Sequence, residues 1–287
     1  MTTSILATIL LAAIFHSIWN IIANKSTHNE TLLWLQMVVA NIVLTPFIIC
    51  NYSFPNPKAW PTLIASGLLQ AFYYLFLAKC YQIGNLSIVY PFVRGSAPVF
   101  VCLFSFILGT EHLSFPIILA LLLTVLGIYI VNMPNLSLDS LTAPIKTLLK
   151  DKSTRLSMLI GIIIAFYTLI DKQNVKYCEP MLVYYIICVI PCLTLAPYII
   201  RKGEIKAELE GFGKFKVCFV SLFTFLAYFL VLTAMSQTDA SYVSSIREVS
   251  VVFVTIYQSF YTKDYDWLPK VLGSAIIFVG IFLMSYF

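Results

Sequence analysis

Ten long apolar stretches limit what this chain can fold into more than any other feature of its sequence. An α-helix needs about 20 mostly apolar residues to cross the hydrocarbon core of a bilayer. The apolar stretches come close to that length and lie at residues 4–24, 32–50, 61–82, 86–107, 114–132, 156–172, 180–200, 215–236, 240–260 and 268–286. We therefore predict an all-α, polytopic membrane protein with ten transmembrane helices.

The composition supports this prediction and argues against several other classes of protein. Charged residues make up 11% of the chain, whereas a soluble domain carries about 25%. The net charge of +5 is spread over the connections and forms no dense basic run, so we expect no nucleic-acid partner. The seven cysteines form no CxxC pair, and no HExxH, GxSxG or glycine-rich phosphate loop occurs. We expect no metal, no cofactor and no enzymatic activity.

The two halves of the chain resemble each other. At an offset of 151, residues 15–20 align with residues 166–171, and at an offset of 153 Arg94 aligns with Arg247. If each half spans the membrane five times, the second half must enter from the opposite side. The sequence therefore predicts two five-helix inverted repeats, an architecture that permits alternating access to a site at the membrane midplane.

A polar segment with two prolines separates the halves. We predict a first repeat at residues 1–133, a cytoplasmic linker at 134–155 and a second repeat at 156–287. On the side of the membrane that holds the linker, the helix ends and connections carry 13 Lys and Arg residues, against three on the other side. Positive charges favour the cytoplasmic side, so the count predicts that both termini are external.

Arg94 and Arg247 are the most informative polar residues inside the spans, because a charged side chain is costly there and normally faces protein or water. Their equivalent places in the two repeats predict that they converge near the pseudo-twofold axis. A guanidinium pair favours a carboxylate or phosphate on a substrate. Alternatively, Glu248 or Asp171 neutralises one or both arginines, which then only brace the fold.

Further polar side chains complete the set of candidate residues. Besides the two arginines, the candidates for substrate binding are His16, Asn20, Tyr74, Tyr81, Tyr90 and Ser244. Glu248 and Asp171 are candidates for proton coupling, although Glu248 is favoured as a structural partner of an arginine. In a continuous helix Glu248 would point about 100° away from Arg247. Pro91 and Pro98 are expected to bend the fourth helix.

Several short motifs follow the order found in a known family. They are Trp19-Asn20 at the first helix, Ser-Ile-Val-Tyr-Pro at 87–91, Ala-Pro-Val at 97–99, and Gly-Thr-Glu at 109–111. With ten spans in two repeats, the chain resembles the EamA-like family of the drug/metabolite transporter superfamily. The resemblance implies secondary transport, often export, in a bacterial inner membrane.

The second half departs from the family pattern. It lacks prolines equivalent to Pro91 and Pro98, and Asp264 stands where the family has glutamate. Family members are also usually drawn with cytoplasmic termini, which conflicts with the charge count.

We therefore predict a secondary transporter that exports a small anionic or zwitterionic metabolite by alternating access. Its partners would be that substrate and the lipid bilayer, and the chain would act as a monomer or homodimer. One alternative is an exporter of amphipathic or aromatic compounds, recognised by the many aromatic rings. The other is a lipid-linked flippase component or a membrane scaffold, for which a lateral opening to lipid would be the sign.

Overall fold

The structure is a computed structural model of the chain. It describes residues 3–84, 86–109, 114–131, 133–137, 140–143, 145, 150–262 and 267–286. Glu111 and Asp264, which were part of the comparison with the family pattern, lie outside these residues. Everything said below refers to the described part of the chain.

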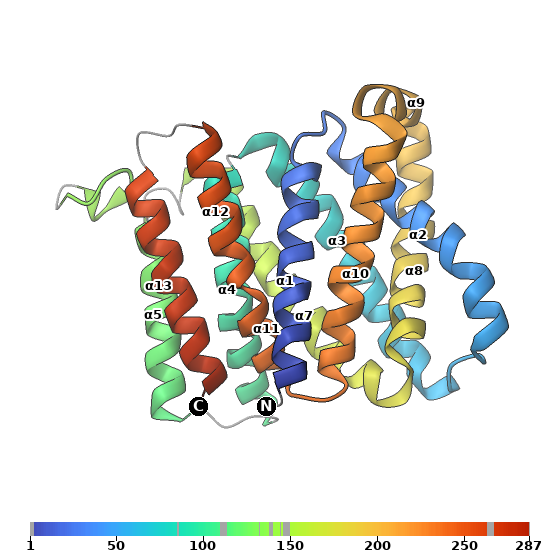
Figure 1. Cartoon of the computed structure of the whole chain (residues 1–287), viewed down its shortest axis with the longest axis horizontal. Coiled ribbons are helices and arrows are strands. Elements are labelled where there is room, and N and C mark those ends of the chain that lie inside the picture. Colours follow the sequence, from blue (N-terminus) through green and yellow to red (C-terminus); the bar gives the residue numbers. More distant parts are fainter. Residues whose placement is uncertain are drawn as a thin grey trace. The chain divides into compact units, whose positions relative to one another are not determined.

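The described residues are helical almost throughout (Figure 1). The helices are α1 (Thr3–Ala23), α2 (Asn29–Asn51), η1 (Pro57–Ala59), α3 (Trp60–Ile83), α4 (Leu86–Ile107), α5 (Phe115–Val131), α7 (Lys152–Tyr177), α8 (Pro180–Lys202), α9 (Ile205–Glu208), η3 (Leu209–Gly213), α10 (Lys214–Met235), α11 (Ala240–Arg247), α12 (Val249–Thr262) and α13 (Trp267–Tyr286).

The predicted fold class is confirmed. Within the described residues, six helical segments are long and apolar enough to cross a membrane: those of α1, α2, α3, α7, α8 and α10. Shorter apolar helices account for the predicted fourth, fifth and tenth spans. Counting α11 and α12 as one interrupted helix, the described chain has ten principal helices, as the hydropathy predicts.

The predicted helix at 240–260 is interrupted at Glu248, which separates α11 from α12. At the break, Arg247 ends α11 and Glu248 precedes α12. A cation is stabilised at a helix C-terminus and an anion at a helix N-terminus. By contrast, α4 stays helical through Pro91 and Pro98, so its bending at these prolines remains a prediction.

The helices form two compact units, each built from both halves of the sequence. Unit 1 holds residues 1–82 and 166–239, and unit 2 holds residues 83–165 and 240–287. The division between them falls within α7.

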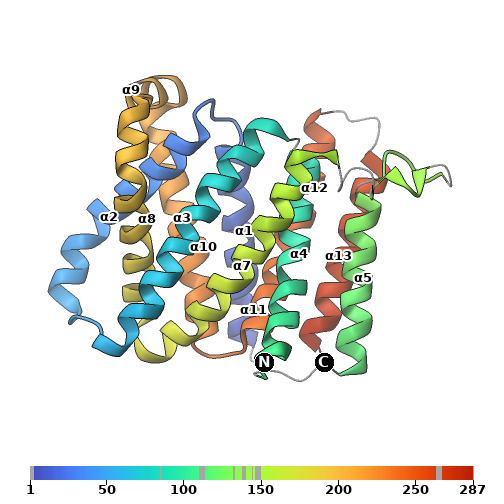
Figure 2. The same ribbon diagram turned by 180° about the vertical axis from the view of Figure 1, so that it is seen from behind.

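In unit 1, α1 packs against α10, and α2 packs against α8 and α10. Figure 2 shows α3 alongside the second part of α7, and hydrogen bonds described below join these two helices. A Cβ atom on Gly67 would lie 2.6 Å from the Cβ of Ile190, so α3 also approaches α8 closely. Outward-facing side chains of α2, such as Ile42 and Ile49, are exposed and apolar, as expected for a surface in lipid.

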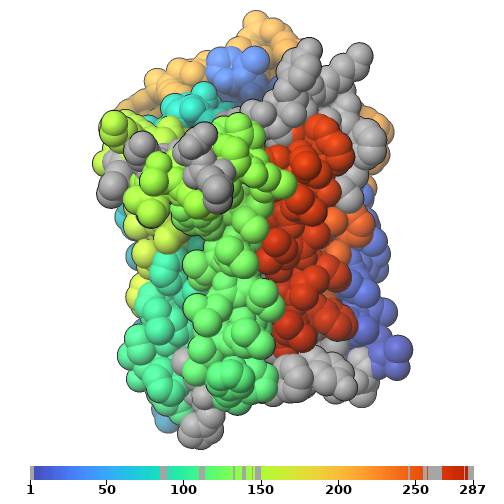
Figure 3. Space-filling model, turned by 90° about the vertical axis from the view of Figure 1, so that its left-hand side faces the viewer, coloured from blue at the N-terminus to red at the C-terminus, as the bar shows by residue number. Residues whose placement is uncertain are grey.

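In unit 2, α5 packs extensively against α13, and the two lie side by side in Figure 3 as the green and red helices. Glycines line the contact. A Cβ atom on Gly127 would lie 2.6 Å from the backbone nitrogen of Ile277, and one on Gly273 would lie 2.6 Å from that of Val131. Small residues let transmembrane helices approach until their backbones touch, which explains why these positions carry no side chain.

Candidate functional site

Unit 2 contains a buried cluster of three charged side chains. Arg94 on α4 places Nη1 3.5 Å from Glu248 Oε1, and Arg247 at the end of α11 places Nε 3.7 Å from the same oxygen. Exposure is 2% for each arginine and 0% for Glu248. The structure thus brings the two repeat-related arginines together on one carboxylate, in the arrangement that the bracing alternative anticipated.

The cluster lies at the break between α11 and α12. In an uninterrupted helix, consecutive side chains diverge by about 100°, so Arg247 and Glu248 would not automatically form a pair. Glu248 instead lies in a turn between the two helices, and Val251 N donates to its carbonyl oxygen at 2.8 Å. The structure places the Glu248 carboxylate within ion-pair distance of both arginines, whereas the predicted span at 240–260 had no such break.

The cluster carries one more positive than negative charge, because two guanidiniums share one carboxylate. Among the described residues, Arg247 Nη2 is buried and has no hydrogen-bond partner. The Ser244 hydroxyl, on the same short helix, is likewise buried and without a hydrogen-bond partner in the described chain. A buried cation with unused donors is suited to an additional anionic group.

Tyr90 lies beside this cluster, one turn before Arg94 on α4. Its hydroxyl donates to Ser250 Oγ at 3.1 Å. The centre of the Arg94 guanidinium is 6.0 Å from the centroid of the Tyr90 ring, at the outer limit of a cation–π contact. The Tyr90 ring therefore lies against the Arg94 side chain, while the Tyr90 hydroxyl forms a hydrogen bond with Ser250 of α12.

Unit 1 contains a second buried polar group, centred on Asp171 of α7, which is 0% exposed. Four side chains donate to its carboxylate. Ser66 Oγ and Asn174 Nδ2 reach Oδ1 at 2.6 and 3.1 Å. Tyr228 OH and Gln70 Nε2 reach Oδ2 at 2.5 and 3.3 Å. Helices α3, α7 and α10 therefore meet at this carboxylate.

The repeat aligns Asp171 of α7 with Asn20 of α1, and the hydrogen bonds around Asn20 are arranged in a similar way. The Tyr81 hydroxyl of α3 donates to Asn20 Oδ1, much as the Tyr228 hydroxyl of α10 donates to Asp171. Asn20 Nδ2 in turn donates to the His16 carbonyl at 2.7 Å. In each repeat, a tyrosine of the third helix thus bonds the residue that the repeat places on the first helix.

The remaining predicted residues also lie in unit 1. His16 is buried, and its Nδ1 accepts a hydrogen bond from Trp19 Nε1 at 3.1 Å. Tyr74 is half-buried and packs edge-on against Tyr73 with ring centroids 5.0 Å apart. The structure therefore divides the predicted residues: His16, Asn20, Tyr74, Tyr81 and Asp171 belong to unit 1, and Tyr90, Pro91, Arg94, Pro98, Ser244, Arg247 and Glu248 to unit 2.

Sequence reasoning missed Ser66 as a partner of Asp171. Ser66 and Gln70 are one helical turn apart in an otherwise apolar span, so both fall on one face of α3. A polar pair at that spacing is the signal that could have identified the face. The partner helix is not readable from the sequence, since Ser66 and Asp171 are 105 residues apart.

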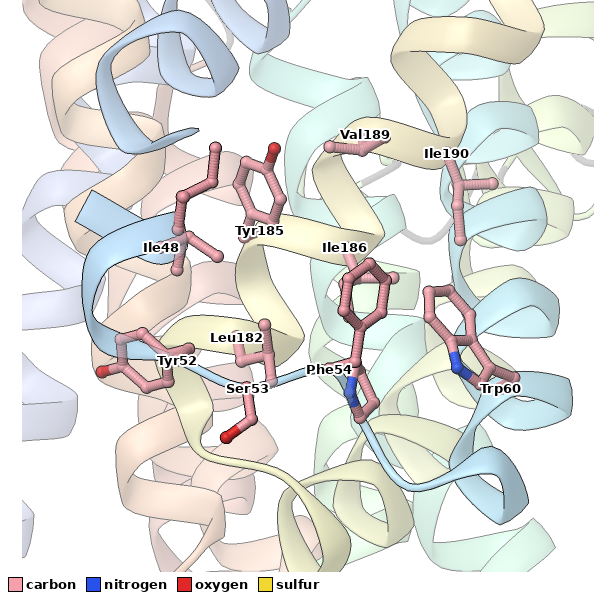
Figure 4. Close-up of a pocket in the computed structure, with 12 residues that line it drawn as sticks. Ile48, Tyr52, Ser53, Phe54, Trp60, Leu182, Tyr185, Ile186, Val189 and Ile190 are labelled. Carbon is pink, nitrogen blue, oxygen red and sulfur yellow. The ribbon is translucent and has the colours of Figure 1, made fainter. Parts of the chain in front are cut away.

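A pocket of about 270 Å³ lies at one end of unit 1 (Figure 4). Its walls come from α2, the segment between α2 and α3, the start of α3, and α8, and they are almost entirely apolar and aromatic. Phe54 and Trp60 line the pocket together with Leu182, Ile186 and Ile190 of α8. The Tyr185 hydroxyl, whose ring lines the pocket, shares a hydrogen bond with Thr45 Oγ1 at 2.9 Å. Such a lining suits hydrocarbon or an aromatic ring.

Charged groups also link the start of α2 and the residue before it to the end of α8. Lys202 Nζ lies 3.0 Å from both Glu30 Oε2 and Glu204 Oε2, and His28 Nδ1 lies 3.4 Å from Glu204. Partial burial alone would raise the pKa of Glu204, but Lys202 and the other neighbours outweigh it and hold that pKa below its usual value. This link is a structural tie and offers no unpaired carboxylate.

Comparisons with known proteins agree with this architecture. The sequence model of the EamA-like transporter family matches residues 3–133 and again residues 155–286. A solved structure titled "Crystal structure of protein" aligns with 99% of this chain and 99% of its own, with a TM-score of 0.66 and 13% identity. At that identity the likeness concerns the fold alone. No curated protein sequence matches the chain.

Proposed function

The chain belongs to the EamA-like transporter family, whose members are membrane transporters and not enzymes, and on that premise we propose that it is a secondary transporter of a small anionic or zwitterionic metabolite. Transport would proceed by alternating access between its two repeats. We propose the same domain limits as the sequence analysis: repeats at 1–133 and 156–287, joined by a cytoplasmic linker at 134–155.

The observation that carries the anionic substrate class is the charge of the buried cluster in unit 2. Among the described residues, Arg94 and Arg247 both lie within ion-pair distance of the one carboxylate of Glu248, and Arg247 Nη2 has no hydrogen-bond partner there. Unbalanced buried charge is costly in a membrane protein and marks a functional site more often than a structural one. A carboxylate or phosphate on the substrate would balance it, with Arg247 Nη2 and the Ser244 hydroxyl as donors.

Binding to the purified protein in detergent tests this assignment. A ligand that binds the folded state raises the midpoint of thermal unfolding. From a panel of carboxylates, phosphates, amino acids, neutral sugars and amines, we expect stabilisation only by compounds that carry an anionic group. Arg247→Gln should weaken that binding about tenfold or more, because a charge-assisted hydrogen bond contributes about 1.5–3 kcal/mol.

Two matched variants make the binding result interpretable. Arg155→Gln removes an exposed arginine of the same unit and should bind like the wild type. Arg247→Lys keeps the charge but loses the planar donor pair, so an intermediate affinity is expected. Equal binding by wild type and Arg247→Gln would contradict the recognition role and leave the arginines as braces of the fold.

The apolar pocket of unit 1 supports a second candidate, an exporter of amphipathic or aromatic compounds. Its aromatic and aliphatic lining offers no charged group. In the same unfolding assay, this candidate predicts stabilisation by aromatic amphiphiles that Arg247→Gln leaves unchanged. Ile186→Trp, which places a large ring in the pocket, would abolish the stabilisation.

The proposed orientation follows from the charge count, with the linker in the cytoplasm, both termini external, and export across a bacterial inner membrane. Positive-inside statistics support it. We expect a C-terminal alkaline phosphatase fusion to be active and a C-terminal green fluorescent protein fusion to be dark. The reverse pattern would place the termini in the cytoplasm, as is usual for relatives in this family.

A further inference from the structure

Asp171 and Glu248 are both buried carboxylates within the spans, but they have different kinds of partner side chains. Glu248 is held by two guanidiniums, which carry only donors. If Glu248 took up a proton, its new hydroxyl would find no acceptor on those groups, and both arginines would lose their counter-charge. These two cationic partners therefore favour the ionised form of Glu248.

Asp171 has partners of another kind. Ser66 and Tyr228, at 2.6 and 2.5 Å, are hydroxyls, and a hydroxyl can either donate or accept by rotating its proton. Gln70 Nε2 lies 3.5 Å from Ser66 Oγ as well as 3.3 Å from Asp171 Oδ2, so it can support the serine oxygen in either arrangement. Ser66 or Tyr228 can therefore hydrogen-bond the Asp171 carboxyl both when it is ionised and when it is protonated.

The charge of Asp171 is also uncompensated within the described chain. No described lysine, arginine or histidine forms an ion pair with it. Its neighbour Lys172 directs Nζ away, to the carbonyl oxygens of Met235 and Thr238 at 2.8 and 2.7 Å. A buried carboxylate without a counter-ion is costly in a low dielectric, and binding a cation removes that cost.

The helices packed around Asp171 carry phenols and lysines. On α3 and α7, the rings of Tyr73 and Tyr167 meet edge to face with centroids 5.8 Å apart, and the ring centroid of Tyr167 lies 6.1 Å from that of Tyr228 on α10. Lys79 of α3 and Lys176 of α7 are exposed. Lys214 and Lys216 stand at the far start of α10, and α1, which packs on α10, contributes His16 but no charged residue.

We infer that Asp171 is a reversible proton-binding site and that it supplies the proton of a proton-coupled transport cycle. In the ionised state, Ser66, Tyr228, Gln70 and Asn174 all donate to the carboxylate. When a proton from water binds one carboxyl oxygen, the adjacent hydroxyl rotates and accepts from it. The inference rests on the proposed transport function, but proton binding itself needs no substrate.

Infrared difference spectroscopy of the purified protein in lipid membranes tests this directly, with the proton as the only ligand. On acidification we expect a protonated-carboxyl stretching band that shifts in deuterated water. Asp171→Asn should lack it. Glu208→Gln is the matched control, since Glu208 is also buried in unit 1 and accepts a hydrogen bond from the Ser26 hydroxyl at 2.7 Å. The band assigned to Asp171 should be unchanged in this variant.

A second variant protects the test against misfolding of Asp171→Asn. Tyr228→Phe keeps the aromatic ring at position 228 and the carboxyl of Asp171, but it removes the phenol hydroxyl that donates to that carboxyl. The carboxyl band should therefore remain and titrate at a different pH from that of the wild type. A band that persists in Asp171→Asn, or that is lost only in Glu208→Gln, would overturn the inference. The inference would also be overturned if the wild type showed no titrating band but bound tetraphenylphosphonium and lost that binding in Asp171→Asn, since the site would then serve an organic cation.

The outcome also separates this inference from the proposed function. A titrating Asp171 band in a protein that moves no metabolite supports the proton site and contradicts the transporter. Transport without an Asp171 band contradicts the proton site alone.

Discussion

Replacing Glu248 with glutamine is expected to lower the free energy of unfolding by about 3–5 kcal/mol, the usual cost of breaking a buried ion pair. The substitution keeps the size of the side chain but removes its negative charge. Arg94 and Arg247, each 2% exposed, would then face each other with no counter-charge between them. Reversible unfolding in mixed detergent micelles, followed by tryptophan fluorescence, measures the change.

Two further variants identify the cause. Glu210→Gln removes a carboxylate whose side chain is 68% exposed, in a helical pair with Lys206 at 3.9 Å; exposed pairs contribute little, so stability should hardly change. The double variant Arg247→Gln/Glu248→Gln should recover part of the loss, because one of the two repelling cations is gone. A double variant less stable than Glu248→Gln alone would contradict the electrostatic explanation.

Replacing Gly127 with alanine is expected to separate α5 from α13 and to cost about 1–3 kcal/mol, as overpacking of a close contact does. The new methyl group would lie 2.6 Å from the backbone nitrogen of Ile277 and 2.7 Å from the Gly273 carbonyl oxygen. Backbone atoms cannot move aside as a flexible side chain can, so the helices themselves must shift. The midpoint of thermal unfolding should fall accordingly.

Gly211→Ala is the matched control for this substitution. A Cβ atom there would meet no heavy atom within 4 Å, and alanine restricts the unfolded chain more than glycine does. We expect stability equal to that of the wild type or slightly above it. If Gly127→Ala and Gly211→Ala behave alike, the close approach of α5 and α13 does not limit stability.

Hydropathy alone predicted the helices, because each span must satisfy its backbone hydrogen bonds internally and bury itself in lipid. The repeat offset singled out Arg94 and Arg247, which the structure then brings to one carboxylate. The break at Glu248 was not predictable in the same way. No glycine or proline marks residues 247–249, and the ion pair of Glu248 with Arg94 joins residues that come together only when α4 packs beside the break.

The hydrogen-bond partners of Asp171 were also only partly predictable from the sequence. The repeat aligned Asp171 with Asn20, and in the structure both side chains accept a hydrogen bond from a tyrosine hydroxyl. Which helices supply the other donors depends on how α3, α7 and α10 assemble, and sequence periodicity carries no information on that. The apolar pocket is invisible in the sequence for the same reason, since its lining looks like ordinary lipid-facing residues.

Efflux from proteoliposomes tests the central claim most directly. Vesicles with the purified protein are loaded with a mixture of carboxylates, phosphates, amino acids, neutral sugars and amines, and the compounds that leave are identified by mass spectrometry. The account predicts that at least one anionic or zwitterionic compound leaves faster than from protein-free vesicles, and that Arg247→Gln slows it while Arg155→Gln does not. Release of neutral or cationic compounds alone, or of nothing beyond the protein-free rate, would contradict it.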